Sequence, residues 1–120
     1  MQTALSPTPD AIDALIAKVC FNEDGLVAAI AQDIENGDVL MMAWMNADTL
    51  RETLETGRAC YWSRSRQAFW RKGDTSGHTQ TVHDLMVDCD GDTILMKITQ
   101  IGAACHTGER TCFFTSVNEL

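Results

Sequence analysis

The chain alternates short apolar segments with polar turns, a pattern that predicts several β-strands. Residues 26–32 and 39–45 are apolar, and the Glu-Asn-Gly-Asp run at 35–38 has strong turn chemistry, so together they predict a β-hairpin. Further strands are expected at 59–62, 79–88, 93–101 and 111–116, with a tight turn at Asp90-Gly91.

Two stretches have the spacing of helices. The first is expected to begin at an Asp10 cap, after a frayed start over residues 1–9, and its apolar positions are Ile12, Leu15, Ile16 and Val19. The second is expected to begin at an Asn46 cap and to end where Gly57 fits the C′ position. The pattern predicts an α+β fold, a compact single domain over residues 1–120 made of antiparallel β-hairpins with two short helices.

Composition and charge narrow the classes of function. The chain has 120 residues, 45% of them hydrophobic, which is enough for one core. Its N-terminus resembles no export signal and no window approaches the ~20 apolar residues of a membrane span, so we expect a cytoplasmic protein without a membrane partner. A net charge of -8 argues against nucleic-acid binding, which needs a broad basic face.

The five cysteines suggest metal chemistry, because an odd number in a reducing compartment does not form a disulfide framework. Cys89, Cys105 and Cys112 lie in the polar, turn-rich last third of the chain, and three thiolates would leave zinc an open fourth position for water. The alternative is that these three are unrelated, since no C-x-x-C pair is present. Cys20 and Cys60 have apolar neighbours and are expected to be small buried hydrophobes.

Two other segments carry candidate ligands. Asp88, Asp90 and Asp92 alternate around Cys89 and would share one face of an extended strand, where they could hold Mg²⁺ or Ca²⁺ or form only a solvated acidic turn. Residues 62–80 interleave aromatic and basic side chains, as a nucleotide site requires, although an edge strand with solvated cations has the same composition. The proposed substrate contacts are Arg64, Arg66, Trp70, Lys72, Thr75 and Ser76.

The three histidines have different expected roles. His106 follows Cys105 and precedes a turn-like Thr-Gly, so it is the candidate general acid or base beside a zinc-activated water. His83 lies in a strand pattern and is expected to make local hydrogen bonds. The role of His78 stays open.

Four ordered motifs resemble phosphoribosyl-AMP cyclohydrolase over roughly residues 20 to 115. They are Arg-Ser-Arg at 64–66, Trp-Arg-Lys-Gly-Asp-Thr-Ser-Gly-His-Thr-Gln at 70–80, Asp-Cys-Asp-Gly-Asp at 88–92, and Ala-Cys-His-Thr-Gly at 104–108 with Cys-Phe-Phe at 112–114. The sequence departs from the family pattern at His78, where asparagine is usual, and at Asp74, where glutamate is common.

The resemblance implies an intertwined homodimer with one zinc per subunit, shared across the interface between Cys89 of one subunit and Cys105 with Cys112 of the other. It also implies that Asp88, Asp90 and Asp92 hold Mg²⁺. The implied reaction is hydrolysis of the N1–C6 bond of 1-(5-phosphoribosyl)-AMP by zinc-activated water, the third step of histidine biosynthesis. The family's fused pyrophosphohydrolase domain is expected to be absent.

The sequence leaves two alternative functions. A zinc nucleobase deaminase would also send water to a purine or pyrimidine carbon, but its H-x-E and P-C-x-x-C signatures do not occur in the sequence. A non-catalytic module in which zinc only holds two copies together is the alternative from a different class.

Overall fold

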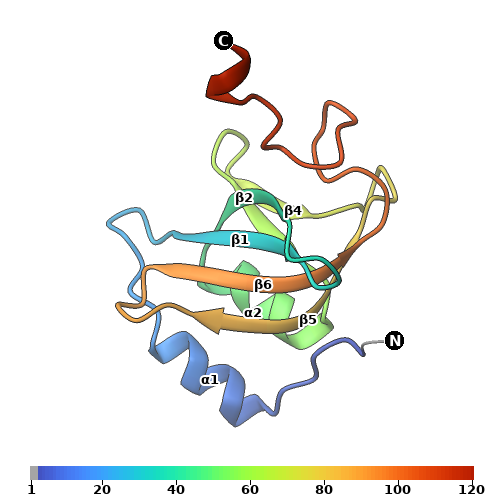
Figure 1. Ribbon diagram of the computed structural model, residues 1–120. Helices are drawn as coiled ribbons and strands as arrows, with labels where there is room; N and C mark the ends of the chain where they lie inside the picture. The colour runs from blue at the N-terminus through green and yellow to red at the C-terminus, as the bar shows by residue number, and fades with distance from the viewer. Residues whose placement is uncertain (1–2) are drawn as a thin grey trace.

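A computed structural model describes residues 3–120 and shows two sheets and two α-helices (Figure 1). The larger sheet has the strand order β2-β1-β6-β5, and the smaller one pairs β3 with β4. The strands are β1 (Val27–Asp33), β2 (Val39–Met45), β3 (Cys60–Ser63), β4 (Ala68–Arg71), β5 (Gln80–Val87) and β6 (Thr93–Gln100); the helices are α1 (Pro9–Ala17), α2 (Ala47–Thr56) and a short 3-10 helix, Val117–Glu119. The α+β class is confirmed.

Local capping determines where α2 begins and ends. The Asn46 side chain accepts a hydrogen bond from the Thr49 N–H, and the Thr49 hydroxyl accepts one from the Asn46 N–H, which satisfies two otherwise unpaired donors. Gly57 ends the helix in the left-handed region with a φ of 73°. Both predicted ends are therefore confirmed. Helix α1 instead takes its cap from Thr8, not Asp10, because Pro9 occupies the first helical position, where its missing N–H costs nothing.

The large sheet is not wholly antiparallel. β1 forms the expected hairpin with β2, and β5 forms one with β6, but β1 and β6 run parallel, with Ile30 opposite Leu95. This pairing joins the two hairpins into one sheet. The expectation of antiparallel hairpins holds for each hairpin and is wrong for the strand pair that unites them.

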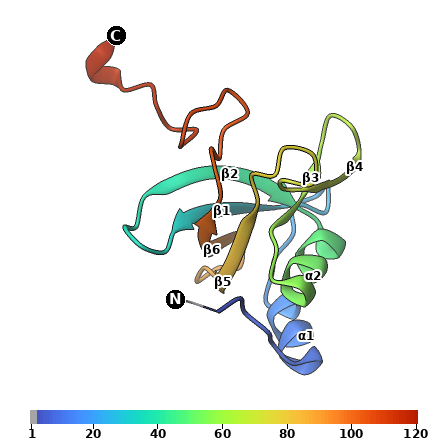
Figure 2. The same cartoon turned by 90° about the vertical axis from the view of Figure 1, so that its right-hand side faces the viewer.

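The two faces of the large sheet differ in exposure. On one face Ile94, Met96 and Ile98 of β6 are fully buried. Both helices lie on the same side of the sheet as each other (Figure 2). On the opposite face one apolar residue from each strand forms a row across the sheet, namely Met42, Ile30, Leu95 and Met86. Met42 is 45% and Met86 36% exposed, so this apolar row is left uncovered within one chain.

The ends of the chain differ from expectation. Residues 111–116 form no strand; the segment leaves the body of the molecule after Cys112 donates its N–H to the Leu40 carbonyl at 2.7 Å (Figure 1). At the other end, Leu5 donates to the Val82 carbonyl and packs on the core, so residues 3–9 are not frayed. Residues 1–2 lie outside the described residues. None of the helices over residues 3–120 is long and apolar enough to span a bilayer.

Candidate active site

A pocket of about 700 Å³ opens between the loop after β4 and the segment after β6. Its walls come from four parts of the chain: the middle of β2, Arg66 in the turn between β3 and β4, the 70–78 stretch, and the 103–112 segment. Five of the six proposed substrate contacts line it, which are Arg66, Trp70, Lys72, Thr75 and Ser76, together with His106, Cys105 and Cys112. The structure thus brings together residues from three of the four motifs, which are far apart in sequence.

Arg64 is not in this group. Its guanidinium lies over the Trp44 ring, 5.1 Å from the ring centroid, and Arg64 is not among the residues that line the pocket. Such a cation–π contact provides a structural reason for an arginine at this position. The prediction that Arg64 contacts the same ligand as Lys72 therefore receives no support from its position.

Cys105 and Cys112 face the same pocket and influence each other. Partial burial and the neighbouring Cys105 thiol together raise the pKa of Cys112 to about 11. The Thr107 hydroxyl donates to Cys105 Sγ at 3.1 Å and lowers the pKa of that thiol. A pair of adjacent thiols with a supporting hydroxyl is two-thirds of a three-sulfur zinc site.

The Lys72 ammonium lies beside these two thiols. Burial lowers the pKa of Lys72, and the nearby Cys112 and Cys105 partly offset that effect. Lys72 is only 7% exposed. Its Nζ donates to the His78 carbonyl at 3.0 Å, which fixes the position of the ammonium group. Lys72 thus places a positive charge where anionic ligands would gather.

Cys89 does not join the other two cysteines. It is exposed in the β5–β6 turn, whereas Cys105 follows the far end of β6. Strand β6 has eight residues, which at the usual rise per residue separates the two regions by roughly 26 Å. Among residues 3–120, the only group of three potential metal ligands contains no cysteine. One chain by itself therefore cannot bring the three sulfurs together.

The one such group is Asp88, Asp90 and Asp92, whose ligand oxygens lie within 4.8 Å of one another. They converge through a turn rather than through the strand alternation expected from sequence, because β5 ends at Val87. Asp88 Oδ1 accepts from the Asp92 N–H at 2.9 Å, which closes the turn. Loss of solvent alone would raise the pKa of Asp88, but the side chains of Asp92 and Asp90 and the backbone N–H groups of the turn outweigh that effect and lower it. Three converging exposed carboxylates fit a hard cation.

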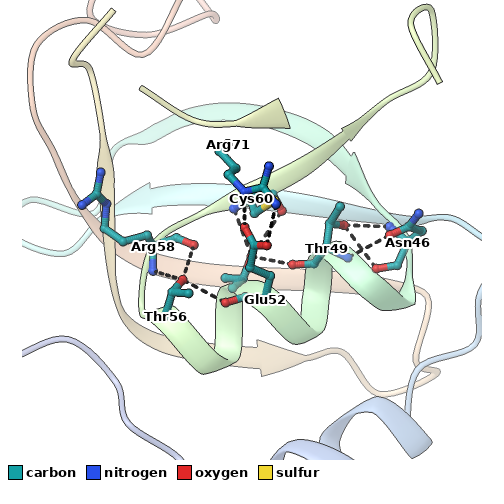
Figure 3. Close-up of polar contacts among 8 residues, drawn as sticks. Asn46, Thr49, Glu52, Thr56, Arg58, Cys60 and Arg71 are labelled. Carbon is teal, nitrogen blue, oxygen red and sulfur yellow. Dashed lines mark hydrogen bonds and ion pairs between the residues drawn. The ribbon is translucent and has the colours of Figure 1, made fainter. Parts of the chain in front are cut away.

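A polar cluster between α2 and the small sheet adjoins the pocket (Figure 3). Glu52 accepts two hydrogen bonds from Arg71, at 2.8 and 2.9 Å, and this contact lowers the pKa of the glutamate. The Cys60 thiol lies beside the pair, while its N–H donates to Thr53 Oγ1 at 3.0 Å. Sequence reasoning missed this cluster, because residues 19 positions apart on different elements leave no local signal.

The remaining histidine and cysteines give a mixed result. His83 bonds the Thr3 carbonyl at 2.8 Å and the Thr99 hydroxyl at 2.7 Å, which confirms its expected local role. Cys60 is 1% exposed, as predicted. Cys20 is exposed, so its predicted burial is wrong: it follows the end of α1 and borders the acidic turn, where its N–H donates to the Gly91 carbonyl.

Comparison with known proteins decides the family. The model of the family described as phosphoribosyl-AMP cyclohydrolase matches residues 41–114, more than half of the chain and a span that includes every residue lining the pocket. The chain belongs to the phosphoribosyl-AMP cyclohydrolase family. It is therefore an enzyme, and the family to which the motifs point is confirmed.

Relatives extend the match beyond the family model. The phosphoribosyl-AMP cyclohydrolase of Paramagnetospirillum magneticum is 63% identical over 103 residues, covering 86% of this chain and 78% of that protein. That of Corynebacterium jeikeium is 66% identical over 100 residues, with 83% and 79% covered. The phosphoribosyl-AMP cyclohydrolase of Gluconobacter oxydans is 56% identical over 115 residues, covering 96% of this chain and 73% of that protein.

The protection of Cys60 can be tested by alkylation. Burial raises the pKa of Cys60 from 9.0 to about 12, so its thiol stays protonated at pH 8. Because the thiolate is the reactive form, iodoacetamide should label Cys60 at least ~100-fold more slowly than the exposed Cys20 in the folded protein. Mass spectrometry of digests gives both rates, and denaturant should make them equal. Comparable rates in the folded state would contradict the described burial.

The same pKa has a consequence for stability. The folded value exceeds the unfolded one, so the contribution of Cys60 is fully present below pH 9 and is lost as the pH rises toward 12. A Cys60→Ala variant, which has no titrating thiol, should therefore show a smaller decline in unfolding free energy over that window.

Proposed function

We propose that this enzyme hydrolyses the N1–C6 bond of 1-(5-phosphoribosyl)-AMP with a zinc-activated water, the third step of histidine biosynthesis, in the cytoplasm. The observation that carries the proposal is the shared pocket, in which two thiols, an imidazole and a loop with basic and hydroxyl side chains face one space. The family match and the printed names of the relatives support the substrate and the pathway.

The zinc ligands would be Cys105 and Cys112 of one chain with Cys89 of a second copy. The donor set fits, because thiolates are strong zinc ligands and two of the three thiols already lie side by side. When bound, zinc would lower the pKa of a water molecule and so supply a nucleophile near neutral pH. The third sulfur has to come from another chain, since β6 separates Cys89 from the pair.

The second copy also has a surface to occupy. Met42, Ile30, Leu95 and Met86 leave an apolar row across the uncovered face of the large sheet. Exposed apolar patches of this kind mark contacts with other proteins, and here a second copy would also complete the sulfur set. We therefore infer a homodimer with one zinc per subunit at the interface.

Mg²⁺ would bind the acidic turn. The three carboxylates of Asp88, Asp90 and Asp92 repel one another unless a cation or water offsets their charge, and oxygen ligands are those that Mg²⁺ prefers. Because Cys89 lies between the first two aspartates, a partner that contributes its Cys89 to the pocket also brings this turn near the substrate. The cation would there bind or orient a nucleotide phosphate.

The chain's own residues then have separate tasks. Lys72, Arg66 and the hydroxyls of Thr75 and Ser76 hold phosphate and ribose oxygens, and Trp70 forms an aromatic wall for the base. His106, exposed beside Cys105, accepts a proton from the attacking water and returns it to N1 as the N1–C6 bond breaks. The water oxygen stays on C6, and its second proton leaves to solvent as the carbonyl forms. C6 keeps its amino group and becomes the carboxamide, so the positive charge of the protonated substrate ring departs with that proton.

Metal removal tests the substrate, the reaction and the cofactors together. Purified, metal-analysed protein is incubated with 1-(5-phosphoribosyl)-AMP while the absorbance change of ring opening is followed. Chelation should abolish turnover, and zinc plus magnesium should restore it where either alone does not. Full activity in the chelated, metal-free protein would rule out the metal assignment, and no turnover by the metal-loaded protein would rule out the substrate.

Mixing inactive variants tests the shared zinc site. Cys89→Ser and Cys105→Ser should each be inactive, but refolding them together should restore about a quarter of wild-type activity, because half of the dimers are mixed and each has one complete site. Cys105→Ser mixed with Cys112→Ser is the matched control and should stay inactive, since both changes affect the same side. Equal recovery in the two mixtures would contradict a site shared between subunits.

His106→Ala tests the proton relay. We expect kcat to fall about 10²- to 10⁴-fold, the usual contribution of a general acid–base group, with zinc content unchanged. The half-buried His83, whose ring bonds Thr3 and Thr99 away from the pocket, supplies the control variant His83→Ala, and it should leave kcat within about twofold. A His106→Ala enzyme with full ring-opening activity would disprove the relay.

A further inference from the structure

His78 and Gly102 make a contact that joins two walls of the pocket. His78 ends the loop that carries Thr75 and Ser76, and Gly102 begins the segment that leads to Cys105. A Cβ built on Gly102 would lie 2.5 Å from His78 Cδ2 and 2.8 Å from its Nε2, closer than real atoms approach. The imidazole therefore occupies the space that any side chain at position 102 would need.

The backbone of His78 is fixed independently of its ring. Its carbonyl accepts from Lys72 Nζ at 3.0 Å and from Gln100 Nε2 at 3.4 Å. A Cβ on Gly73 would lie 2.6 Å from the Thr79 nitrogen, so the start of the loop is pressed against its end. Because both ends of the loop are fixed, the His78 ring has a defined position, in which it packs against Gly102.

Hydrogen-bonded side chains also fix the segment that leads to Gly102. Gln80 accepts a hydrogen bond from the Tyr61 hydroxyl at 2.6 Å and donates to Gln100 Oε1 at 2.8 Å, and all three residues lie next to the two walls. Gln100 in turn donates to the Ile101 carbonyl at 2.9 Å, directly before Gly102. Two side-chain contacts therefore join the pocket walls: Gln100 donates to the His78 carbonyl, and the His78 ring lies against Gly102.

We propose that His78 is a positioning residue, whose ring packs on Gly102 and sets the spacing between the hydroxyl-bearing loop and the segment that carries His106. The proposal rests on the proposed function, in which the loop holds substrate and His106 moves the proton. Errors of about 1 Å in such a spacing can cost about 100-fold in rate, so a packing contact outside the chemistry can control turnover.

Gly102→Ala tests the proposal, with Gly25→Ala as the matched control. Both glycines have positive φ, +68° and +76°, but nothing lies within 4 Å of a Cβ at position 25, whereas at 102 the new methyl displaces the imidazole. We expect Gly102→Ala to lower kcat for 1-(5-phosphoribosyl)-AMP at least ~10-fold with KM within about threefold, and Gly25→Ala to leave both unchanged. Zinc affinity, measured by chelator competition, should be unchanged in both. A parallel loss of zinc affinity in Gly102→Ala would overturn the proposal.

Variants at position 78 separate packing from backbone strain. In a His78→Ala background, Gly102→Ala should add no more than about twofold to the loss of kcat, because the ring with which the methyl collides is gone. His78→Asn keeps a planar group out to the δ atoms and should retain most of the activity that His78→Ala loses. An undiminished effect of Gly102→Ala in the His78→Ala background, or equal losses in His78→Asn and His78→Ala, would overturn the proposal.

Amide hydrogen exchange provides a readout that needs no substrate and that applies even if Gly102→Ala does not fold. His78→Ala should raise exchange in both residues 73–79 and residues 101–106, because each loses the other's support. Exchange raised in one segment only, or in neither, would overturn the proposal. Absence of turnover in the wild-type enzyme would instead count against the proposed function. The exchange result would still test the packing contact, because it needs no substrate.

Discussion

Strand β6 sets the constraint on which the rest of the molecule depends. It runs through the large sheet, paired on both sides, with Cys89 and the acidic turn before one end and Cys105 with His106 after the other. Because β6 stays extended between its two neighbours, the candidate metal ligands of one chain lie in two separate regions. The uncovered apolar row on the same sheet is consistent with the proposed second copy, which would cover it.

The pocket combines rigid support with irregular backbone. Its loops, residues 72–79 and 101–112, form no helix or strand, and they adjoin hydrogen-bonded polar side chains, namely Tyr61, Gln80 and Gln100. The Glu52–Arg71 pair ties the strand before the pocket to α2, whose own ends are fixed by side-chain and glycine caps. Binding groups on loops that a rigid scaffold holds in place are a common arrangement in enzymes.

Local features were predictable from sequence and distant pairings were not. The Asn46 and Gly57 ends of α2 and the first hairpin follow from chemistry within a few residues. The parallel pairing of β1 with β6 depends on residues more than 60 positions apart, and no periodicity reports it. For the site, motif order identified the pocket residues, but Arg64 stacks on Trp44 and Cys20 is exposed, because side-chain direction depends on the tertiary structure.

The separation of Cys89 from the other two sulfurs also bears on how the enzyme responds to its own abundance. If each reaction centre needs parts from two chains, a lone chain has no catalytic capacity, and output at high dilution falls more steeply than the number of molecules. A cell that expresses the protein weakly would then lose flux out of proportion to the loss of protein. A small change in the affinity between subunits would then change the total activity without altering any group that contacts the nucleotide.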